Sequence, residues 1–219
     1  MRIGNCKTNK SGFIRKTKGL QMKIKDTLFC VLDTETTGIN KQRDKLVEIS
    51  LIVFKPFEYK YFKVFDALIN PGIPIPPTAQ KIHGITDAMV KSEKDIKDLF
   101  PEVIDIIGEY PLIAHNAAFD MTFLNVISDY LKIPFKTDNL VFDSLVLARE
   151  AWKNTRHNLD DLAVFLGLEW NGKHHRSIID CQMTIKVFEK AIKELKINEF
   201  SELVDICKAK QISNFKPKL

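Results

Sequence analysis

One stretch near the start of the chain constrains its fold more than any other. Residues 28–32 form a short apolar run with the length and composition of a buried strand. The run continues into the six residues DTETTG at 33–38, where the glycine ends the strand. Side chains alternate across a strand, so Asp33 and Glu35 point to the same face. Two carboxylates are therefore expected side by side where a buried strand ends.

These two acids need a compensating positive charge, because like charges repel each other at such a short distance. A hard divalent cation such as Mg²⁺, which takes oxygen ligands, is the usual solution. The alternative is a solvated pair of acids at the end of a strand, with no metal bound. The other acidic segments of the chain favour the metal.

The order of the remaining elements predicts an α/β fold. Residues 46–54 and 60–69 read as two further strands, and short turns join the first three strands into an antiparallel meander. Short strands at 111–115 and 141–142 then alternate with helices, so we expect a mixed five-stranded sheet flanked by helices. The expected helices cover 78–83, 92–108, 117–131 after an Asn116 cap, Asp143 or Ser144 to 151, Asn158 to 166, 178–195 and 199–208.

Composition bounds the class of protein. The chain has 219 residues, enough for one domain of ordinary size, and its 45% hydrophobic and 28% charged residues are typical of a soluble globular protein. Its apolar runs are all far shorter than the roughly 18 residues of a membrane span, so no membrane partner is expected. The four cysteines are scattered and lack zinc-site spacing, which favours free thiols in a reducing cytoplasm.

The positive charge of the chain is concentrated at its beginning. Residues 1–25 hold eight Lys and Arg and no acid, whereas the whole chain has a net charge of +5, so the remainder is net negative. The segment lacks the apolar core of a secretory signal. Three interpretations stay open: a phosphate-attracting flexible arm, an organelle targeting segment, or an extension upstream of a true start at Met22 rather than Met1. The domain is then expected at 26–196, followed by a short helix and polar tail at 197–219.

A second acidic segment is HNAAFD at 115–120. If Asn116 caps the following helix, Asp120 lies one turn in, and the strand ending at His115 can lie beside the first strand. Asp120 would then overhang the same end of the sheet as Asp33. The alternative is an acid that the helix dipole favours in a first turn.

The third segment is HHRSIID at 174–180. Five residues along a helix place His175 and Asp180 about 140° apart, so both cannot face one site if both are helical. His175 can fold back over Asp180 if it lies in the loop before the helix. The alternative is a pair of solvent-exposed loop histidines.

Together these segments resemble a known family. Asp33-x-Glu35, then Asn116-x-x-Phe119-Asp120, then His175-x₄-Asp180 match in order and spacing the three motifs of the DEDDh branch of the DEDD exonucleases, which have a ribonuclease H-like fold. The likeness extends over about residues 27–195. Further segments make it most similar to the epsilon-type proofreading exonucleases of bacterial DNA polymerase III: DTETTG, IHGITD at 82–87, HNAAFD, residues 143–149 and 158–162, and HHRSIID.

The resemblance implies a metal-dependent 3′→5′ exonuclease that releases 5′-mononucleotides from DNA 3′ ends with two divalent ions, Mg²⁺ or Mn²⁺. By motif, Asp33 would bridge both ions, Glu35 and Asp180 would help hold the ion that carries the attacking water, and Asp120 would act on the second ion. His175 would be the general base, since an unperturbed histidine pKa near 6.5 suits that role.

The resemblance also implies substrate contacts. Thr36, Thr37 and His83 match segments that hold the terminal nucleotide, and His115 could line the same pocket. For His83 the alternative is a cap at the end of a short helix. The expected substrate is a single-stranded or frayed DNA 3′ end, because an unpaired end is easier to bring into a site.

Two protein partners follow from the same resemblance. One is the catalytic subunit of DNA polymerase III. The other is the sliding clamp, because Gln211–Phe215 resembles the bacterial clamp-binding pentapeptide apart from Asn214; the alternative is a disordered polar tail. An RNA 3′-end trimming enzyme and a non-catalytic nucleic-acid binding module remain rival functions.

Overall fold

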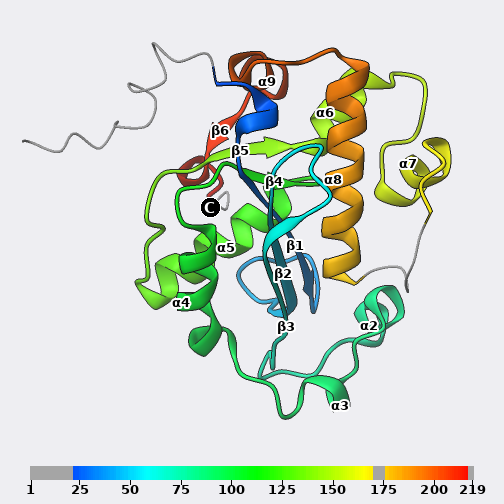
Figure 1. Ribbon diagram of the computed structural model, residues 1–219. Coiled ribbons are helices and arrows are strands. Elements are labelled where there is room, and N and C mark those ends of the chain that lie inside the picture. The colour runs from blue at the N-terminus through cyan, green and yellow to red at the C-terminus, as the bar shows by residue number, and fades with distance from the viewer. Residues whose placement is uncertain (1–21, 170–175, 217–219) are drawn as a thin grey trace, which may run out of the picture.

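The structure, a computed structural model, describes residues 22–169 and 176–216. Its centre is a six-stranded mixed sheet in the order β3-β2-β1-β4-β5-β6 (Figure 1). The strands are β1 (Phe29–Thr36), β2 (Leu46–Phe54), β3 (Tyr61–Leu68), β4 (Leu112–Ala114), β5 (Leu140–Asp143) and β6 (Lys210–Gln211).

The sheet has the predicted topology with one extra strand. β1, β2 and β3 form the antiparallel meander, and β4 and β5 join β1 in parallel. β6 adds an antiparallel edge next to β5, so the prediction of five strands was wrong by one. A strand of two residues carries no alternation pattern, and here the chain that follows it is fixed by burial of Ile212.

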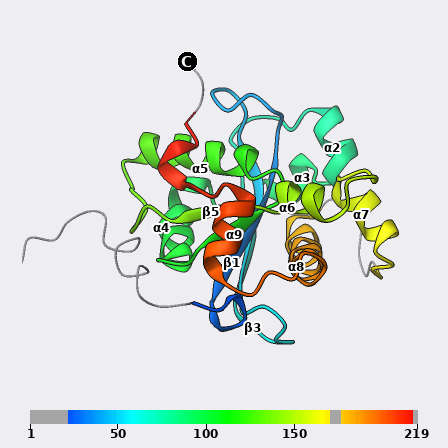
Figure 2. The same ribbon diagram turned by 90° about the horizontal axis from the view of Figure 1, so that it is seen from above.

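Helices cover both faces of the sheet. Figure 2 shows α4 and α5 on one side and α6, α7 and α8 on the other. The helices are α2 (Pro77–His83), α3 (Asp87–Val90), α4 (Ile96–Ile107), α5 (Ala118–Leu131), α6 (Ser144–Ala151), α7 (Leu159–Phe165), α8 (Ser177–Glu194) and α9 (Phe200–Cys207). Within the described ranges, no helix is long and apolar enough to cross a membrane.

The central strand β1 alternates between the two cores. Cys30 and Leu32 pack into the core under α4 and α5, whereas Phe29 and Val31 pack into the core under α8 and α9. The Phe29 ring lies 5.4 Å from that of Phe188 on α8, in an edge-on arrangement. This alternation decides which helix each polar residue farther along β1 will face.

Two predicted helix starts were wrong. Asn116 has a left-handed backbone (φ 65°) and precedes the N-cap, so α5 begins at Ala118. Asparagine tolerates this conformation better than most residues, and the Asn116 amide donates to Asp143 Oδ1 at 3.0 Å. α4 begins at Ile96 rather than near residue 92, because the Asp95 side chain accepts a hydrogen bond from the Lys97 amide and caps the helix.

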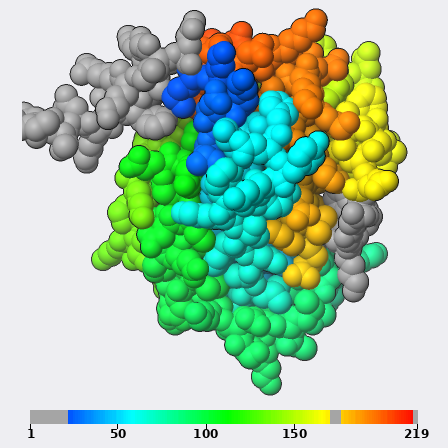
Figure 3. Space-filling view, in the orientation of Figure 1, coloured from blue at the N-terminus to red at the C-terminus, as the bar shows by residue number. Residues whose placement is uncertain are grey.

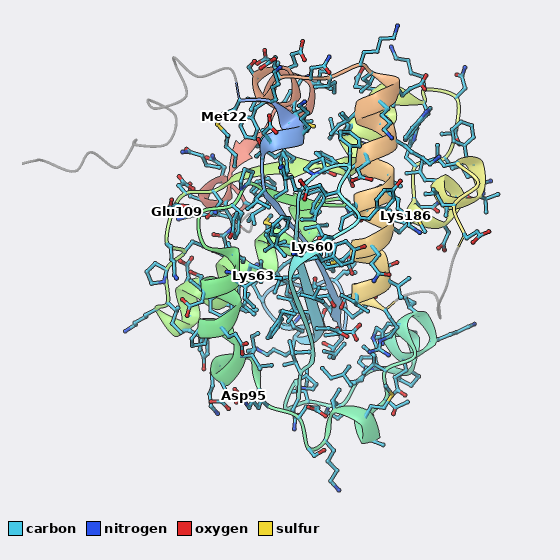
Figure 4. All side chains as sticks on the ribbon, in the orientation of Figure 1. Met22, Lys60, Lys63, Asp95, Glu109 and Lys186 are labelled. Atoms are coloured by element: carbon cyan, nitrogen blue, oxygen red, sulfur yellow. The ribbon has the colours of Figure 1, made fainter. Side chains whose placement is uncertain are left out.

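The two ends of the described chain pack onto the domain. The Phe200 amide donates to the Met22 carbonyl at 2.8 Å, which holds Met22 beside α9 (Figure 4). Ile212 is 1% exposed, and Asn125 Nδ2 donates to the carbonyls of Ile212 and Phe215. The pentapeptide that resembles a clamp-binding motif is therefore packed against α5, and clamp binding finds no support in the structure.

Strand β3 forms the other edge of the sheet. It lies at the surface between α4 and α8 (Figure 3), and Tyr61, Phe62 and Val64 are exposed. Lys63 lies at the centre of the same view in Figure 4, with its Nζ 5.8 Å from the centre of the Tyr110 ring. Lysines on an edge strand discourage pairing with another chain.

Candidate active site

Three carboxylates meet where β1 ends beside the beginning of α8. Asp33 and Glu35 continue the face of β1 that carries Phe29 and Val31, so both face α8. Asp180 lies in the first turn of α8. One carboxylate oxygen from each of these acids lies within 4.8 Å of the others. Two segments about 145 residues apart in sequence thus form one acidic cluster.

Asp120 approaches from the opposite layer. It lies in the first turn of α5 and is 3% exposed. Thr34, which points away from Asp33 and Glu35 on β1, donates its hydroxyl hydrogen to Asp120 Oδ1 at 2.7 Å. Asp120 is not among the three acids of the tight cluster, but its charge raises the pKa of Asp33.

Burial and mutual repulsion dominate the electrostatics of the site. The pKa of Asp33 is raised well above its ordinary value, first by burial and then by the charges of Asp120 and Asp180. Burial, Asp180 and Glu48 raise the pKa of Glu35 to about 9. Burial raises the pKa of Asp120 to about 7, although the Thr34 hydroxyl opposes that shift. These acids cannot all be ionised near neutral pH without a compensating positive charge.

The donor set fits a divalent cation. The ligand atoms that the acids offer are carboxylate oxygens, as Mg²⁺ and Mn²⁺ prefer, and they converge from β1 and α8. A cation would stabilise the ionised form of these acids, which burial, and for Asp33 and Glu35 also mutual repulsion, disfavours. The site therefore suits a divalent metal, and its chemistry leaves the identity of that metal open.

The predicted substrate residues Thr36 and Thr37 shape the loop after β1. The Thr36 hydroxyl donates to the Gly38 carbonyl at 2.6 Å, and the Thr37 hydroxyl donates to Asp44 Oδ1 at 3.2 Å. A Cβ on Gly38 would lie 2.5 Å from Asp44 Oδ2, so a larger residue there would force the Asp44 carboxylate to move. Both hydroxyl groups are thus engaged within the loop.

The predicted substrate histidines are held by hydrogen bonds. His83 is 3% exposed at the end of α2, and its Nδ1 accepts from the Ile85 amide at 3.0 Å. His115 Nδ1 lies 2.8 Å from Ser144 Oγ, and its Nε2 lies 2.7 Å from the His157 carbonyl. Burial lowers the pKa of His115, which favours the neutral ring. His174 and His175 lie outside the described residues.

An open groove of about 810 Å³ runs from the acidic cluster along α6 and α7. Asp180 is the member of the acidic cluster that lines it, together with residues that include His115, Arg149, His157 and Asn158. Asp143 has the capping role expected from the sequence, because its Oδ1 accepts from the Leu145 amide at 2.9 Å. Asn158 likewise caps α7 by accepting from the Asp161 amide.

Comparison with known proteins decides the family. The RNase T model, described as an exonuclease, matches residues 30–188. The chain belongs to the RNase T exonuclease family. It is also 31% identical over 84% of its length to the PolC-type DNA polymerase III of Caldanaerobacter subterraneus subsp. tengcongensis, and 33% identical over 78% to that of Bacillus subtilis. The matches cover only 13% and 12% of those relatives, so the chain spans about one eighth of their length.

Solved structures support the same fold. This RNase T exonuclease resembles Exonuclease X in complex with 5′-overhanging duplex DNA, at 26% identity and a TM-score of 0.65, over 82% of this chain and 99% of that one. Exonuclease I of E. coli in complex with a dT13 oligonucleotide gives a TM-score of 0.69 at 17% identity, over 78% of this chain and 42% of that one. The predicted ribonuclease H-like fold and the predicted exonuclease class are confirmed.

Three residues without an assigned role in the sequence motifs, Thr34, Glu48 and Arg176, help to build this RNase T site. Thr34 supports Asp120, while Glu48 on β2 binds Arg176 and the Ser177 amide at the beginning of α8. Glu48 had a signal in the sequence, since it is a charged residue inside the apolar run at 46–54. A buried charge needs a partner, and the sequence pattern does not indicate which residue it is. The fold brings Arg176 alongside Glu48.

Proposed function

We propose that this exonuclease degrades DNA from 3′ ends, releases 5′-mononucleotides and depends on two divalent cations, Mg²⁺ or Mn²⁺. The observation that carries the proposal is the convergence of Asp33, Glu35 and Asp180 within 4.8 Å, with Asp120 beside them. These four acids would hold the cations. When bound, such cations stabilise the negative charge that develops on the attacking and leaving oxygens of a phosphodiester.

The remaining roles belong to the chain itself. His175, which lies outside the described residues, is proposed as the general base that takes a proton from the attacking water on an imidazole nitrogen. Its place five residues before Asp180, in the motif His175-x₄-Asp180, supports that role. Glu35 would help orient the same water. The hydrogen-bonded loop of Thr36 and Thr37 would shape one wall of the pocket for the terminal nucleotide, and His83 and His115 are proposed to contact the same nucleotide.

The groove along α6 and α7 offers a path for the strand that leads to the site. It opens from Asp180, and Arg149 supplies a positive charge along it. DNA is proposed over RNA because the chain is similar over 84% of its length to a PolC-type DNA polymerase III and because the Exonuclease X complex contains DNA. A frayed or mismatched end would enter most easily.

The similarity to PolC-type polymerases also supports a role in proofreading or repair, in association with DNA polymerase III. Cys30, Cys181 and Cys207 are free thiols, which supports the proposal of a reducing, cytoplasmic environment.

The proposal is tested with labelled single-stranded DNA, duplex DNA with a mismatched 3′ end, and RNA of the same sequence. Each substrate is incubated with Mg²⁺, Mn²⁺ or EDTA, and the products are separated by length. We expect a ladder of products shortened from the 3′ end and 5′-mononucleotides, both abolished by EDTA and by Asp33→Ala. Full activity in EDTA would overturn the metal dependence. Degradation of RNA in preference to DNA would support the 3′-end trimming function instead.

A further inference from the structure

Glu48 is a buried acid that no step of the proposed reaction uses. It lies in the middle of the first half of β2, is 0% exposed, and stands opposite Glu35 in the antiparallel register. Burying an ionised carboxylate is unfavourable unless it is paired and hydrogen-bonded. Its presence beside an already acidic cluster therefore requires a specific compensating contact.

Both oxygens of Glu48 bind donors at the beginning of α8. Oε1 accepts hydrogen bonds from Arg176 Nε, at 2.8 Å, and from Arg176 Nη2. Oε2 accepts from the Ser177 amide at 2.8 Å. Each oxygen of Glu48 is thus engaged by a donor. Glu48 is also not one of the three acids whose oxygens converge, so it is not placed as a metal ligand.

These contacts replace a missing helix cap. The N-cap position of α8 is Arg176, whose side chain makes no capping hydrogen bond. Helices need acceptors for their first amides, and a negative charge at this end also interacts favourably with the helix dipole. Glu48, which lies on β2, supplies both the hydrogen-bond acceptor and the negative charge. A second tie joins the same two elements, because Ser50 Oγ lies 2.5 Å from Ser177 Oγ.

The cap lies one helical turn from the acidic cluster. Asp180 follows Ser177 by three residues, and the Asp180 amide donates to the Arg176 carbonyl at 3.1 Å. Any rotation or translation of the first turn of α8 would therefore move the Asp180 carboxylate relative to Asp33 and Glu35. Substitution of residues that support metal ligands in this way commonly lowers metal affinity or activity by about 10- to 100-fold.

We propose that Glu48 and Arg176 form a clamp that fixes the first turn of α8 and so positions Asp180 against Asp33 and Glu35. Both are positioning residues rather than catalytic residues. The inference rests on the proposed metal-dependent function and assigns that site a support built from β2. It gives a reason for the one charged residue within the buried strand β2.

The clamp is tested with the full chain carrying Glu48→Gln, Arg176→Met, both of these substitutions together, or Arg176→Lys. Glu102→Gln, on the exposed side of α4, is the matched control. Three quantities are measured: Mn²⁺ affinity by calorimetry without DNA, kcat and KM on a single-stranded oligonucleotide, and hydrogen exchange of the amides at 177–180. Circular dichroism verifies that each variant is folded.

We expect Glu48→Gln to weaken Mn²⁺ binding and lower kcat by about 10- to 100-fold, while KM for the oligonucleotide stays unchanged. Exchange should accelerate at 177–180 and not in the second half of α8. The double variant should lose no more than the worse single variant, because the two residues act as one unit. Arg176→Lys, which keeps the positive charge, should lose less than Glu48→Gln.

Several outcomes would overturn the clamp. Folded Glu48→Gln protein with wild-type Mn²⁺ affinity and kcat would do so, as would additive losses in the double variant. If Glu48→Gln does not fold, Arg176→Lys decides by the same measurements. Wild-type protein that binds Mn²⁺ but degrades no DNA would overturn the proposed function alone, because calorimetry and exchange still test the clamp. Wild-type protein that binds no Mn²⁺ would overturn both.

Discussion

The Thr34 hydroxyl donates a 2.7 Å hydrogen bond to Asp120 Oδ1 and so links β1 to α5 across the core. The two neighbours of Thr34 on β1, Asp33 and Glu35, face α8 instead. One strand therefore connects both layers of helices to the acidic cluster. This contact also opposes the effect of burial on the pKa of Asp120, because a hydrogen bond to a carboxylate favours its ionised form.

Thr34→Val should lower activity at neutral pH. Without the hydroxyl, the pKa of Asp120 rises further and a larger fraction of that carboxyl is protonated near pH 7. We expect kcat/KM on single-stranded DNA to fall by about 10- to 100-fold, as for other residues that support metal ligands. The loss should shrink as pH is raised from 7 to 9. Thr34→Ser, which keeps the hydroxyl, is the control, and an equal loss in both variants would contradict the role of the hydrogen bond.

Metal-free protein should lose stability as pH rises. The pKa of Glu35 is about 9 and that of Asp120 about 7 in the folded chain, whereas unfolded acids titrate near pH 4. The folded state therefore binds more protons between about pH 4 and 9, and its stability falls across that window as those protons are released. Thermal unfolding in EDTA, recorded at intervals from pH 5 to pH 9, measures the slope. Added Mg²⁺ should stabilise the protein more at pH 9 than at pH 5, because metal binding displaces the same protons.

Asp33→Asn should separate stability from activity. The substitution removes an acid whose ionised form is disfavoured by burial and by the charges of Asp120, Asp180 and Glu35, while it keeps the shape of the side chain. We expect the metal-free free energy of unfolding at pH 8 to rise by about 1 to 2 kcal/mol, in the range of other stabilising substitutions at functional sites. Exonuclease activity should be lost. Denaturant unfolding in EDTA checks the gain, and Asp98→Asn on the surface of α4 should change neither property.

Whether a feature could be predicted from the sequence depended on how far apart in the chain its interacting residues lie. The meander, the long helix α8 and the caps at Asp143 and Asn158 follow from periodicity and local hydrogen bonding, so they could be predicted. The side-by-side placement of Asp33 and Glu35 followed from strand alternation, whereas their convergence with Asp180 was expected because the motifs resembled a family. The pairing of Glu48 with Arg176 joins residues 128 positions apart, and neither residue has a local pattern that names the other. Asn116 misled because asparagine suits both a cap and a left-handed backbone.

His115→Phe should affect stability more than substrate binding. Both ring nitrogens of His115 are engaged, with Ser144 Oγ and with the His157 carbonyl, and the phenyl ring would leave those partners unpaired. We expect a loss of about 1 to 3 kcal/mol in the free energy of unfolding, the usual result of leaving a buried polar group without a partner. Ser144→Ala should reproduce part of this loss, and the double variant should be less than additive. A large rise in KM at unchanged stability would instead support the predicted contact with the terminal nucleotide.

Ile212→Ala should destabilise the whole domain. Ile212 is 1% exposed in the core under α4 and α5, although it lies only seven residues before Leu219. Truncating a buried isoleucine to alanine costs about 2 to 5 kcal/mol, and denaturant unfolding at 25 °C measures the loss. Asn214→Ala, two residues away and exposed, is the matched control and should be near neutral. Equal stability of the two variants would contradict the packing of this segment. A sliding clamp would have to pull Ile212 out of the core to use it as an anchor, so the free energy gained by burying Ile212 opposes clamp binding. We therefore expect surface plasmon resonance with a bacterial clamp to give no specific signal for the folded wild type.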